Sequence, residues 1–295
     1  MSMAEWALQS RCHWCGGPFK DRLLNSVTVL ACSTTRCFER QAAWKMLDRN
    51  GRLFYLPNPK LVELEEAIES QKYGAICIGG SRAGGKSIGL RRIAQRYVAK
   101  FHEFTVIFLR RTFPELQRNH CRFCPREAER LEAHYSSYKW TVNMTGGQIE
   151  FGHCQDPNDF AKYIGSEADL LIFDQIEMFT DQQVTELSAS LGRIRRDGWR
   201  GLLLAGENPG GPLSSFVDEL FISKTRDTKR YPDYNPDMYH FIPASLEDNP
   251  YVPNSYVQFL AGLEPIKRDM YRYGRRDRFP GQFFGDFDPA QHVSQ

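Results

Sequence analysis

A glycine-rich stretch in the first third of the chain has residue types and spacing suited to binding phosphate groups. It reads Gly80-Ser81-Arg82-Ala83-Gly84-Gly85-Lys86-Ser87 and fits the pattern G-x-x-x-x-G-K-[ST]. Glycines let backbone N–H groups turn toward phosphate oxygens, Lys86 can reach the outer phosphates, and the Ser87 hydroxyl is a ligand for Mg²⁺. An apolar run precedes the stretch and a helical pattern follows it. We therefore expect residues 80–87 to bind ATP with Mg²⁺.

A second element of this chemistry is an apolar run that ends in an acidic residue. Leu170-Leu171-Ile172-Phe173 has the pattern of a buried strand, and Asp174 follows it directly. A carboxylate at the end of such a strand holds Mg²⁺ directly or through water. We expect Asp174 and Ser87 to share the metal.

The residue after Asp174 is Gln175, where many ATPases of this type carry a Glu that activates the attacking water. An amide can orient water but cannot accept a proton at neutral pH. Three alternatives remain open. A Glu→Gln substitution was introduced to block turnover, the role belongs to Glu177, or the protein naturally hydrolyses slowly with Gln175 positioning water.

A third polar residue also follows an apolar strand pattern. Leu202-Leu203-Leu204-Ala205 leads into Gly206-Glu207-Asn208-Pro209. Asn208 at the end of such a strand can contact the γ-phosphate or its water, although taken alone the sequence is explained better by an Asn-Pro turn. We expect Asn208 to report the presence of the γ-phosphate.

Four cysteines near the N-terminus have spacing typical of a zinc site. Cys12 and Cys15 form one pair, and Cys32 and Cys37 form the other. Small residues after Cys15 suit a tight knuckle, residues 27–31 have a strand pattern and residues 38–47 a helical one. Four thiolates arranged tetrahedrally would bind structural Zn²⁺ in a zinc-ribbon or treble-clef module. The alternative is a small core of reduced thiols.

The elements that must position these residues alternate along the chain. Strand and helix patterns follow each other from residue 75 to 205, including a long helix from Pro114 to about Tyr135, which predicts an α/β fold with a mostly parallel sheet. The predicted units are a zinc module (1–50), a P-loop ATPase core of the ASCE type (51–230) and a lid or linker subdomain (231–285).

Bulk properties narrow the function classes. With 38 Lys+Arg against 36 Asp+Glu the net charge is +2, too near neutral to indicate nucleic-acid binding by itself. No apolar run is long enough to span a membrane, so we expect a soluble intracellular protein without a membrane partner. His120, Cys121, Cys124, His153 and Cys154 could form a second metal site, but Cys121 and Cys124 are explained more simply as neighbours three positions apart on one helix.

Taken together, four segments resemble the large terminase subunit of tailed bacteriophages. The glycine-rich stretch is similar to that family's P-loop, with Arg82 at the position of its loop arginine. Phe108–Leu116 is similar to the strand and turn that follow, and residues 206–211 to the coupling motif. The most specific likeness is the series Asp248-Asn249-Pro250-Tyr251-Val252-Pro253, Tyr273-Gly274 and Gly281-Gln282-Phe283-Phe284.

The resemblance implies an ATP-hydrolysing motor that moves double-stranded DNA into a procapsid in the host cell cytoplasm. It implies a homo-oligomeric ring, although the domain alone could be monomeric, with the portal and the small terminase subunit as partners. Arg82 and an arginine from a neighbouring subunit would stabilise developing charge. The candidates for the second arginine are Arg118, Arg193, Arg195, Arg196 and Arg200. Family members usually continue into a nuclease domain, and this chain stops where that domain would begin. The resemblance thus implies that residues 286–295 are the start of a truncated nuclease connection. We therefore expect this chain not to cleave DNA.

Two departures from the family leave other functions open. Gln175 replaces the catalytic Glu, and Lys60 stands where an adenine-reading Gln is often found. The alternatives are a nucleotide-binding module that assembles without hydrolysis and a zinc-bearing helicase-like ATPase. A basic segment with interleaved aromatic residues, 267–278, is a candidate DNA contact or a solvated helical face.

Overall fold

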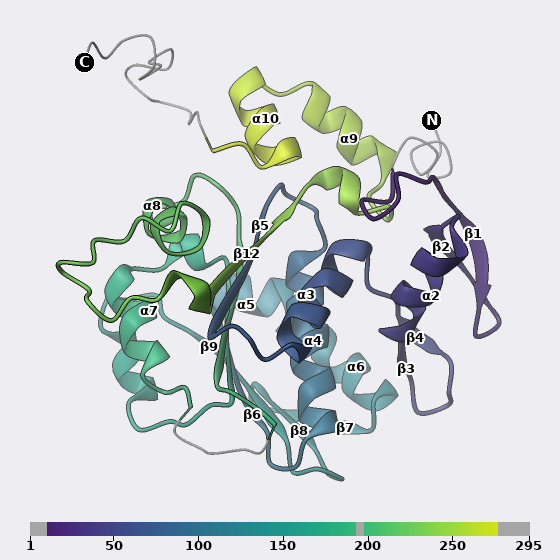
Figure 1. Ribbon diagram of the computed structural model, residues 1–295. Coiled ribbons are helices and arrows are strands. Elements are labelled where there is room, and N and C mark those ends of the chain that lie inside the picture. The colour runs from purple at the N-terminus through teal and green to yellow at the C-terminus, as the bar shows by residue number, and fades with distance from the viewer. Residues whose placement is uncertain (1–10, 193–197, 277–295) are drawn as a thin grey trace, which may run out of the picture.

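The computed structural model describes residues 11–192 and 198–276, and its central feature is an eight-stranded sheet (Figure 1). The strand order is β12-β5-β11-β10-β6-β9-β8-β7. Strands β12 to β9 run parallel, and β8 and β7 extend the sheet as antiparallel strands. This confirms the predicted α/β fold with a mostly parallel sheet. The strands are β5 (Ala75–Gly80), β6 (Thr105–Arg110), β7 (Ala133–Ser136), β8 (Lys139–Val142), β9 (Gln148–His153), β10 (Leu170–Asp174), β11 (Leu202–Glu207) and β12 (Tyr239–Ala244).

Helices cover both faces of the sheet because successive strand residues point to opposite sides. In β10, Leu170 and Ile172 pack into the core on one face, whereas Leu171 and Phe173 pack into the core on the other. The first face is covered by α3 (Pro59–Glu69), α4 (Lys86–Lys100), α5 (Phe113–Asn119) and α6 (Cys124–Arg130), and the second by α7 (Asp181–Ser188) and α8 (Ser214–Val217). The same alternation directs Asp174, the last residue of β10, toward α4.

The helix predicted from Pro114 to about Tyr135 is wrong, because the structure divides this segment. Helix α5 ends at Asn119, a 3₁₀ turn spans Cys121–Phe123, and α6 begins at Cys124 before β7. Pro125 lies in the first turn of α6, where its missing N–H is tolerated, but a proline in a helix interior would break the hydrogen-bond ladder. The break leaves His120 at a helix end, with its side chain fully buried.

The segment predicted as a lid or linker contributes one strand to the main sheet. Strand β12 pairs with β5, and its Ile242 and Ala244 enter the sheet core. Helices α9 (Asn254–Ala261) and α10 (Pro265–Tyr273) instead pack around a small core of their own and lie over the carboxyl end of β5 (Figure 1). Gly274 ends α10 at φ +69°, and a Cβ there would come within 2.6 Å of Gly80 Cα, so the two chain segments pack closely. The predictions for 277–295 lie outside the described residues.

The N-terminal module stands at one side of the sheet beside α3 (Figure 1). Strands β1 (Phe19–Leu24) and β2 (Val27–Cys32) form an antiparallel hairpin, followed by α2 (Thr35–Ala43). A short pair, β3 (Met46–Leu47) and β4 (Leu53–Tyr55), leads from the module to the sheet. The buried core of the N-terminal module consists of Cys12, Phe19, Cys32 and Cys37. Among the described residues, Phe19 is therefore its single large buried apolar side chain.

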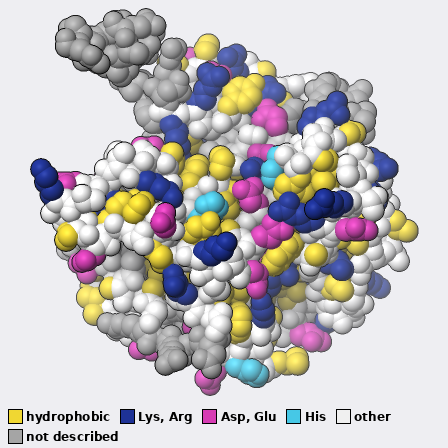
Figure 2. Space-filling model, in the orientation of Figure 1, with side chains coloured by type: hydrophobic (Ala, Val, Ile, Leu, Met, Phe, Trp, Pro, Cys, Tyr) yellow, Lys and Arg dark blue, Asp and Glu magenta, His cyan; other side chains and the backbone are white. Residues whose placement is uncertain are grey.

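On the face drawn in Figure 2, Lys and Arg are interspersed with Asp and Glu, in keeping with the net charge of +2. Over the described part of the chain, no helix has the length and apolar character needed to cross a membrane.

Candidate nucleotide-binding site

The loop between β5 and α4, which we call the glycine loop (residues 80–87), borders a cavity of about 480 Å³ at the carboxyl end of the parallel strands. Gly85 precedes α4 at φ +80°, a backbone conformation that side chains with a Cβ rarely adopt. The loop thus leads directly into the first turn of α4, where backbone N–H groups and the helix dipole favour an anion. The cavity is lined by Arg82, Ala83, Gly84, Gly85, Lys86, Ser87, Ile88, Arg110, Glu115, Asp174, Gln175, Gly206 and Asn208.

Ser87 and Asp174, which come from α4 and β10, meet at this cavity. Ser87 Oγ donates to Asp174 Oδ1 at 2.9 Å. The other oxygen, Asp174 Oδ2, accepts from Arg110 and, at 2.8 Å, from His120 Nε2. Burial alone would raise the pKa of Asp174, but the hydrogen bond from His120, the charge of Arg110 and the Ser87 hydroxyl outweigh it and lower this pKa to about 2. The carboxylate is therefore ionised at neutral pH.

The Lys86 side chain is buried and folds back on its own loop. Its Nζ donates to the carbonyl oxygen of Ser81. Burial lowers the pKa of Lys86, while the carboxylates of Glu207, Glu177 and Asp174 oppose that effect. The ammonium group is thus surrounded by acidic groups and lies on the cavity wall.

Two asparagines hold the glycine loop from outside. Asn58 Nδ2 donates to Gly84 O at 3.0 Å, and Asn249 Nδ2 donates to Ala83 O at 2.6 Å. Asn58 also caps α3 by accepting from Leu61 N. Asn58 precedes β5, whereas Asn249 follows β12, so segments on both sides of the loop in sequence fix adjacent carbonyl groups.

The Arg82 side chain packs on α10. Its guanidinium stacks on Tyr271 of that helix, 3.7 Å from the ring centroid, and its backbone N–H donates to Tyr271 O. The contact connects the glycine loop to the helices above the sheet.

Gln175 lines the cavity in a left-handed backbone conformation, with φ 67°. Its Oε1 accepts from Arg110 at 2.6 Å. Arg110 thus contacts both Asp174 and Gln175, and it orients the amide so that the Nε2 donor group is left for other partners. Neither atom of this amide can act as a base.

Glu177 is buried and does not line the cavity. Asn208 Nδ2 lies 3.4 Å from Glu177 Oε1. Burial, followed by the charge of Glu207, raises the pKa of Glu177 to about 8. This carboxyl therefore holds its proton more tightly than an exposed Glu does, and a pKa raised toward neutral pH is compatible with a general base. Asn208 itself lines the cavity.

Glu207, at the end of β11, forms an ion pair with Arg276 just after α10. Its side chain is fully buried, and burial raises its pKa while the charges of Arg276 and Lys86 oppose the shift. The pair joins the end of β11 to the segment above the sheet.

His120, Arg110 and Arg276 are the site residues that sequence reasoning missed. Arg110 stands at the end of a predicted strand, so strand-end position was an available signal. His120 was considered only for a second metal site, and no cluster there brings three ligand atoms together among the described residues. Its contact with Asp174 joins residues 54 positions apart and has no local signature.

Arg200 and two arginines of the basic segment have local contacts in the structure, whereas Arg118 is exposed. Arg200 NH1 lies 3.5 Å from Met238 Sδ, and Arg118 is exposed. Arg193, Arg195 and Arg196 lie outside the described residues. In the basic segment, Arg272 pairs with Glu247 at 2.8 Å and Arg268 with Asp269 at 3.2 Å. These partly exposed ion pairs are compatible with a solvated helical face, and the DNA contact stays a prediction.

The four N-terminal cysteines converge as their spacing predicts. The Sγ atoms of Cys12, Cys15, Cys32 and Cys37 all lie within 4.8 Å of one another. The Thr34 hydroxyl and the backbone N–H of Gly17 lower the pKa of Cys15 to about 6, whereas burial raises the pKa of Cys37 to about 11. A cluster of four thiols at this distance is compatible with a metal ion.

The module contacts the chain segments that carry both loop-holding asparagines. Gln41 Nε2 donates to Pro57 O at 2.7 Å, one residue before Asn58. Tyr251 Oη donates to Leu30 O at 3.1 Å, two residues after Asn249. The module therefore touches the core and the segment after β12 at the same time.

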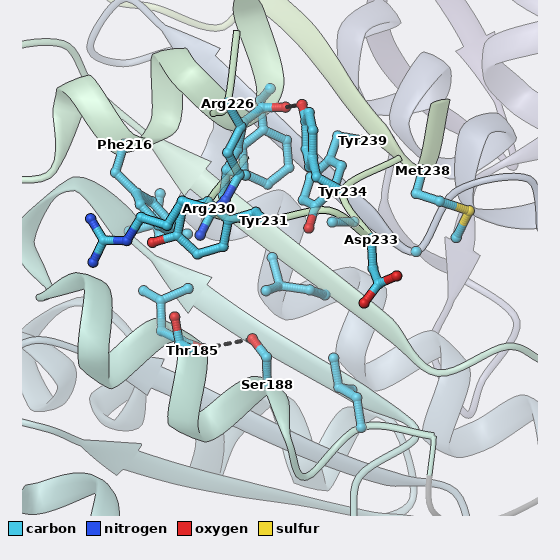
Figure 3. Close-up of a pocket in the computed structure, with 18 of the residues that line it drawn as sticks. Thr185, Ser188, Phe216, Arg226, Arg230, Tyr231, Asp233, Tyr234, Met238 and Tyr239 are labelled. Carbon is cyan, nitrogen blue, oxygen red and sulfur yellow. Dashed lines mark hydrogen bonds between the residues drawn. The ribbon is translucent and has the colours of Figure 1, made fainter. Parts of the chain in front are cut away.

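A second cavity, of about 630 Å³, lies at the amino end of β5 and β11, near Ala75 and Leu203. Figure 3 shows Thr185 and Ser188 of α7 on one side and the aromatic residues Tyr231, Tyr234 and Tyr239 on the other. Its walls are mainly apolar, and it lies at the end of the strands opposite the glycine loop. It lacks the combination of glycine loop, hydroxyl and carboxylate found at the smaller cavity.

No protein-family model matches the sequence, and no curated protein matches it either. Solved structures are similar to it. The large terminase of a thermophilic bacteriophage, in complex with ADP, has a TM-score of 0.55 and 18% identity over 81% of this chain. The chain has the fold of a phage large terminase.

Two further terminases have structures similar to this chain. The large terminase of bacteriophage HK97 has a TM-score of 0.55 and 12% identity over 81% of the chain. A variant of the large terminase ATPase domain of Thermus phage P74-26 has a TM-score of 0.51 and 15% identity over 82% of the chain. The chain spans 58% of the thermophilic phage protein bound to ADP and 55% of the HK97 protein, but 97% of the P74-26 ATPase domain. The chain thus spans nearly all of the P74-26 ATPase domain and little more than half of the two longer terminases.

Proposed function

We propose that this chain is the ATPase motor domain of a phage large terminase, which hydrolyses Mg-ATP at the glycine loop to move double-stranded DNA into a procapsid. The observation that carries the proposal is the 2.9 Å contact of Ser87 Oγ with Asp174 Oδ1 in the cavity lined by the glycine loop. The terminase fold supports it. The partners we propose are the small terminase subunit, the portal and further copies of the chain in a ring in the host cytoplasm.

The residues around the cavity suit this chemistry. A hydroxyl oxygen and a carboxylate oxygen are hard ligands of the type Mg²⁺ prefers, and Ser87 and Asp174 would hold the ion. Bound Mg²⁺ would neutralise charge on the phosphates. Lys86 would exchange the Ser81 carbonyl for phosphate oxygens, and the glycine loop and the start of α4 supply N–H donors.

The remaining polar residues would sense or orient the reacting groups. We propose that Gln175, held by Arg110, and Asn208 position the attacking water near the γ-phosphate, with Arg82 moving from Tyr271 to contribute charge. A second candidate function follows from the contact between Arg110 and Gln175. Because Gln175 cannot accept a proton, the site could bind ATP as an assembly switch without hydrolysing it.

An ATPase assay of the unaltered chain and three variants, with and without double-stranded DNA, tests the proposal. We expect Gln175→Glu to raise turnover by about a hundredfold or more, the usual contribution of a general base. Gln182→Glu, on the exposed face of α7, is the matched control and should leave turnover unchanged. Glu177→Ala tests the other candidate base.

The outcomes separate the alternatives. No gain with Gln175→Glu together with no loss for Glu177→Ala would place hydrolysis elsewhere and contradict the motor assignment for this site. Tight ATP binding without turnover in all four proteins would support the assembly switch.

We further propose that Cys12, Cys15, Cys32 and Cys37 bind a structural Zn²⁺. The module has too small an apolar core to fold on burial alone, and a tetrahedral metal site compensates for that in domains of this size. Through Gln41 and Tyr251, the module would brace the segments that hold the glycine loop.

A further inference from the structure

A closed ring of polar contacts, partly buried at Ser87 and buried at His120 and Arg91, connects the end of β10 to α4. Asp174 accepts from Ser87 at 2.9 Å through Oδ1 and lies 2.8 Å from His120 Nε2 through Oδ2. The other ring nitrogen, His120 Nδ1, lies 3.1 Å from Arg91 NH1. Arg91 follows Ser87 by one turn of α4, so both project from the same side of that helix. The carboxylate is thus held at each oxygen by a group that is itself anchored through α4.

The partners of Arg91 determine which nitrogen of His120 carries the proton. Guanidinium groups only donate hydrogen bonds, so Nδ1 must accept from Arg91. The neutral ring then carries its proton on Nε2 and donates it to Asp174. Arg91 cannot turn away, because Glu127 binds it twice, at 3.0 Å through Nε and at 2.9 Å through NH2. His120 is fully buried, so water does not offer its nitrogens another partner.

The two donors to Asp174 Oδ2 differ in their effect on a cation. Arg110 lines the cavity and carries a positive charge, which opposes a second cation at the same carboxylate. His120 lies behind the carboxylate, does not line the cavity, and donates as a neutral group. It can therefore fix the carboxylate without repelling a metal ion on the other side.

We propose that His120 is a positioning residue that orients Asp174 for Mg²⁺, in the Nε2–H tautomer imposed by Arg91 and Glu127. The proposal rests on the magnesium role proposed above for Asp174. Mg²⁺ requires near-ideal octahedral geometry, so a carboxylate with one oxygen fixed and the other directed at Ser87 binds it better than a freely rotating one. His120 acts through Asp174 and does not contact the ion.

Nucleotide binding with and without Mg²⁺ tests the proposal directly. The affinity of a fluorescent ATP analogue is measured for the whole chain in excess Mg²⁺ and in excess EDTA. His120→Leu removes the donor and should reduce the gain from Mg²⁺ by about tenfold, the scale of one hydrogen bond to a charged group, with little change in EDTA. His120→Gln, whose amide can donate to Asp174, should retain most of the gain.

A double substitution separates the tautomer from simple packing. Arg91→Met lets Nδ1 carry the proton, and Glu127 keeps Arg92 and Gln95 as partners, so the fold should persist. We expect this change to reduce the gain from Mg²⁺ when residue 120 is His and to have no further effect in the His120→Gln background, because the amide needs no tautomer. A residue that only fills space would not show this dependence.

A tautomer measurement on the unaltered chain keeps the proposal testable even if a variant fails to fold. Long-range ¹H–¹⁵N spectra of histidine-labelled protein at pH 7.5 should show His120 protonated on Nε2 alone. Protonation on Nδ1, or a full Mg²⁺ gain in folded His120→Leu, would overturn the proposal. If the unaltered chain binds the analogue equally with Mg²⁺ and EDTA, the proposed function of Asp174 fails instead, and the inference falls with it.

Discussion

The glycine-loop cavity and the cysteine module differ in what holds their polar groups in place. At the cavity, Asp174 is fixed by Ser87, Arg110 and His120, which come from three separate elements packed on a large core. In the module, four thiols lie within 4.8 Å of one another around a core with one large apolar side chain among the described residues. The first region is stabilised by many long-range contacts, whereas the second depends on its cysteines.

The difference indicates how each region should respond to substitutions that remove its contacts. Losing one contact at the cavity should change function while the sheet stays folded, because the core carries the stability. Losing the thiol cluster should unfold the module, because little else holds it. The two regions meet where Gln41 contacts Pro57 and Tyr251 contacts Leu30. We therefore expect unfolding of the module to change the glycine loop only slightly.

The largest expected effect is the unfolding of the module when the proposed Zn²⁺ is removed. A zinc chelator, or Cys32→Ala, should abolish amide protection in residues 11–43 while strands β5, β10 and β11 stay protected, because structural zinc supplies folding free energy of about 10 kcal/mol or more. Hydrogen exchange measures the amide protection, and metal analysis measures the zinc content. Cys154→Ala, a buried cysteine outside the cluster, is the control and should keep one equivalent of zinc. Less than one equivalent in fresh protein would contradict the zinc assignment.

The next effect is on nucleotide affinity. Lys86→Ala should weaken ATP binding about 10- to 100-fold, since it removes a cation that would contact the phosphates, and should leave zinc content unchanged. Titration calorimetry measures the affinity, and Lys72→Ala at an exposed position is the control. Unaltered affinity in Lys86→Ala would exclude the glycine loop as the phosphate site.

A smaller effect concerns pH and the stability of the core. The pKa of Glu177 is about 8 in the folded chain, above its ordinary value of 4.5. The folded state therefore holds this proton more tightly than the unfolded state, and the free energy of unfolding should fall as pH rises from about 4.5 to about 8.

Glu177→Gln should remove that part of the slope, giving a gain of up to a few kcal/mol at pH 8 relative to pH 5. Urea unfolding at the two pH values measures it. Glu186→Gln, exposed on α7, should keep the slope of the unaltered chain. An identical slope in Glu177→Gln would show that this carboxyl is not the buried acid the structure describes.

The smallest effect tests the contact between the two regions. Tyr251→Phe removes the hydrogen bond to Leu30 O and should lower the free energy of unfolding by about 1 kcal/mol or less, with less than about a fivefold loss of ATP affinity. Tyr138→Phe, at another exposed tyrosine, is the control. A loss of ATP affinity as large as that of Lys86→Ala would mean that the module controls the nucleotide site, and the comparison drawn above would be wrong.

The strands and local motifs could be predicted because their signals are short. The glycine loop, the apolar run before Asp174 and the paired cysteines each occupy a few adjacent residues, and β10, β11 and α4 appear where their patterns predict them. The helix over 114–135 was predicted wrongly because its helical pattern continued across the break at His120. Strand β12 was missed because it lies in a segment rich in Tyr, Pro and Asp, whose composition suits turns.

The sequence by itself determined which residues are candidates to bind phosphate, Mg²⁺ and zinc, because residue chemistry and close spacing carry that information. Only the tertiary structure decided what surrounds them. Asn249 reaches Ala83 across 166 positions, and His120 reaches Asp174 across 54, through the packing of separate elements. Contacts of this kind depend on the direction in which the sheet and helices present each side chain, and no local pattern encodes that direction.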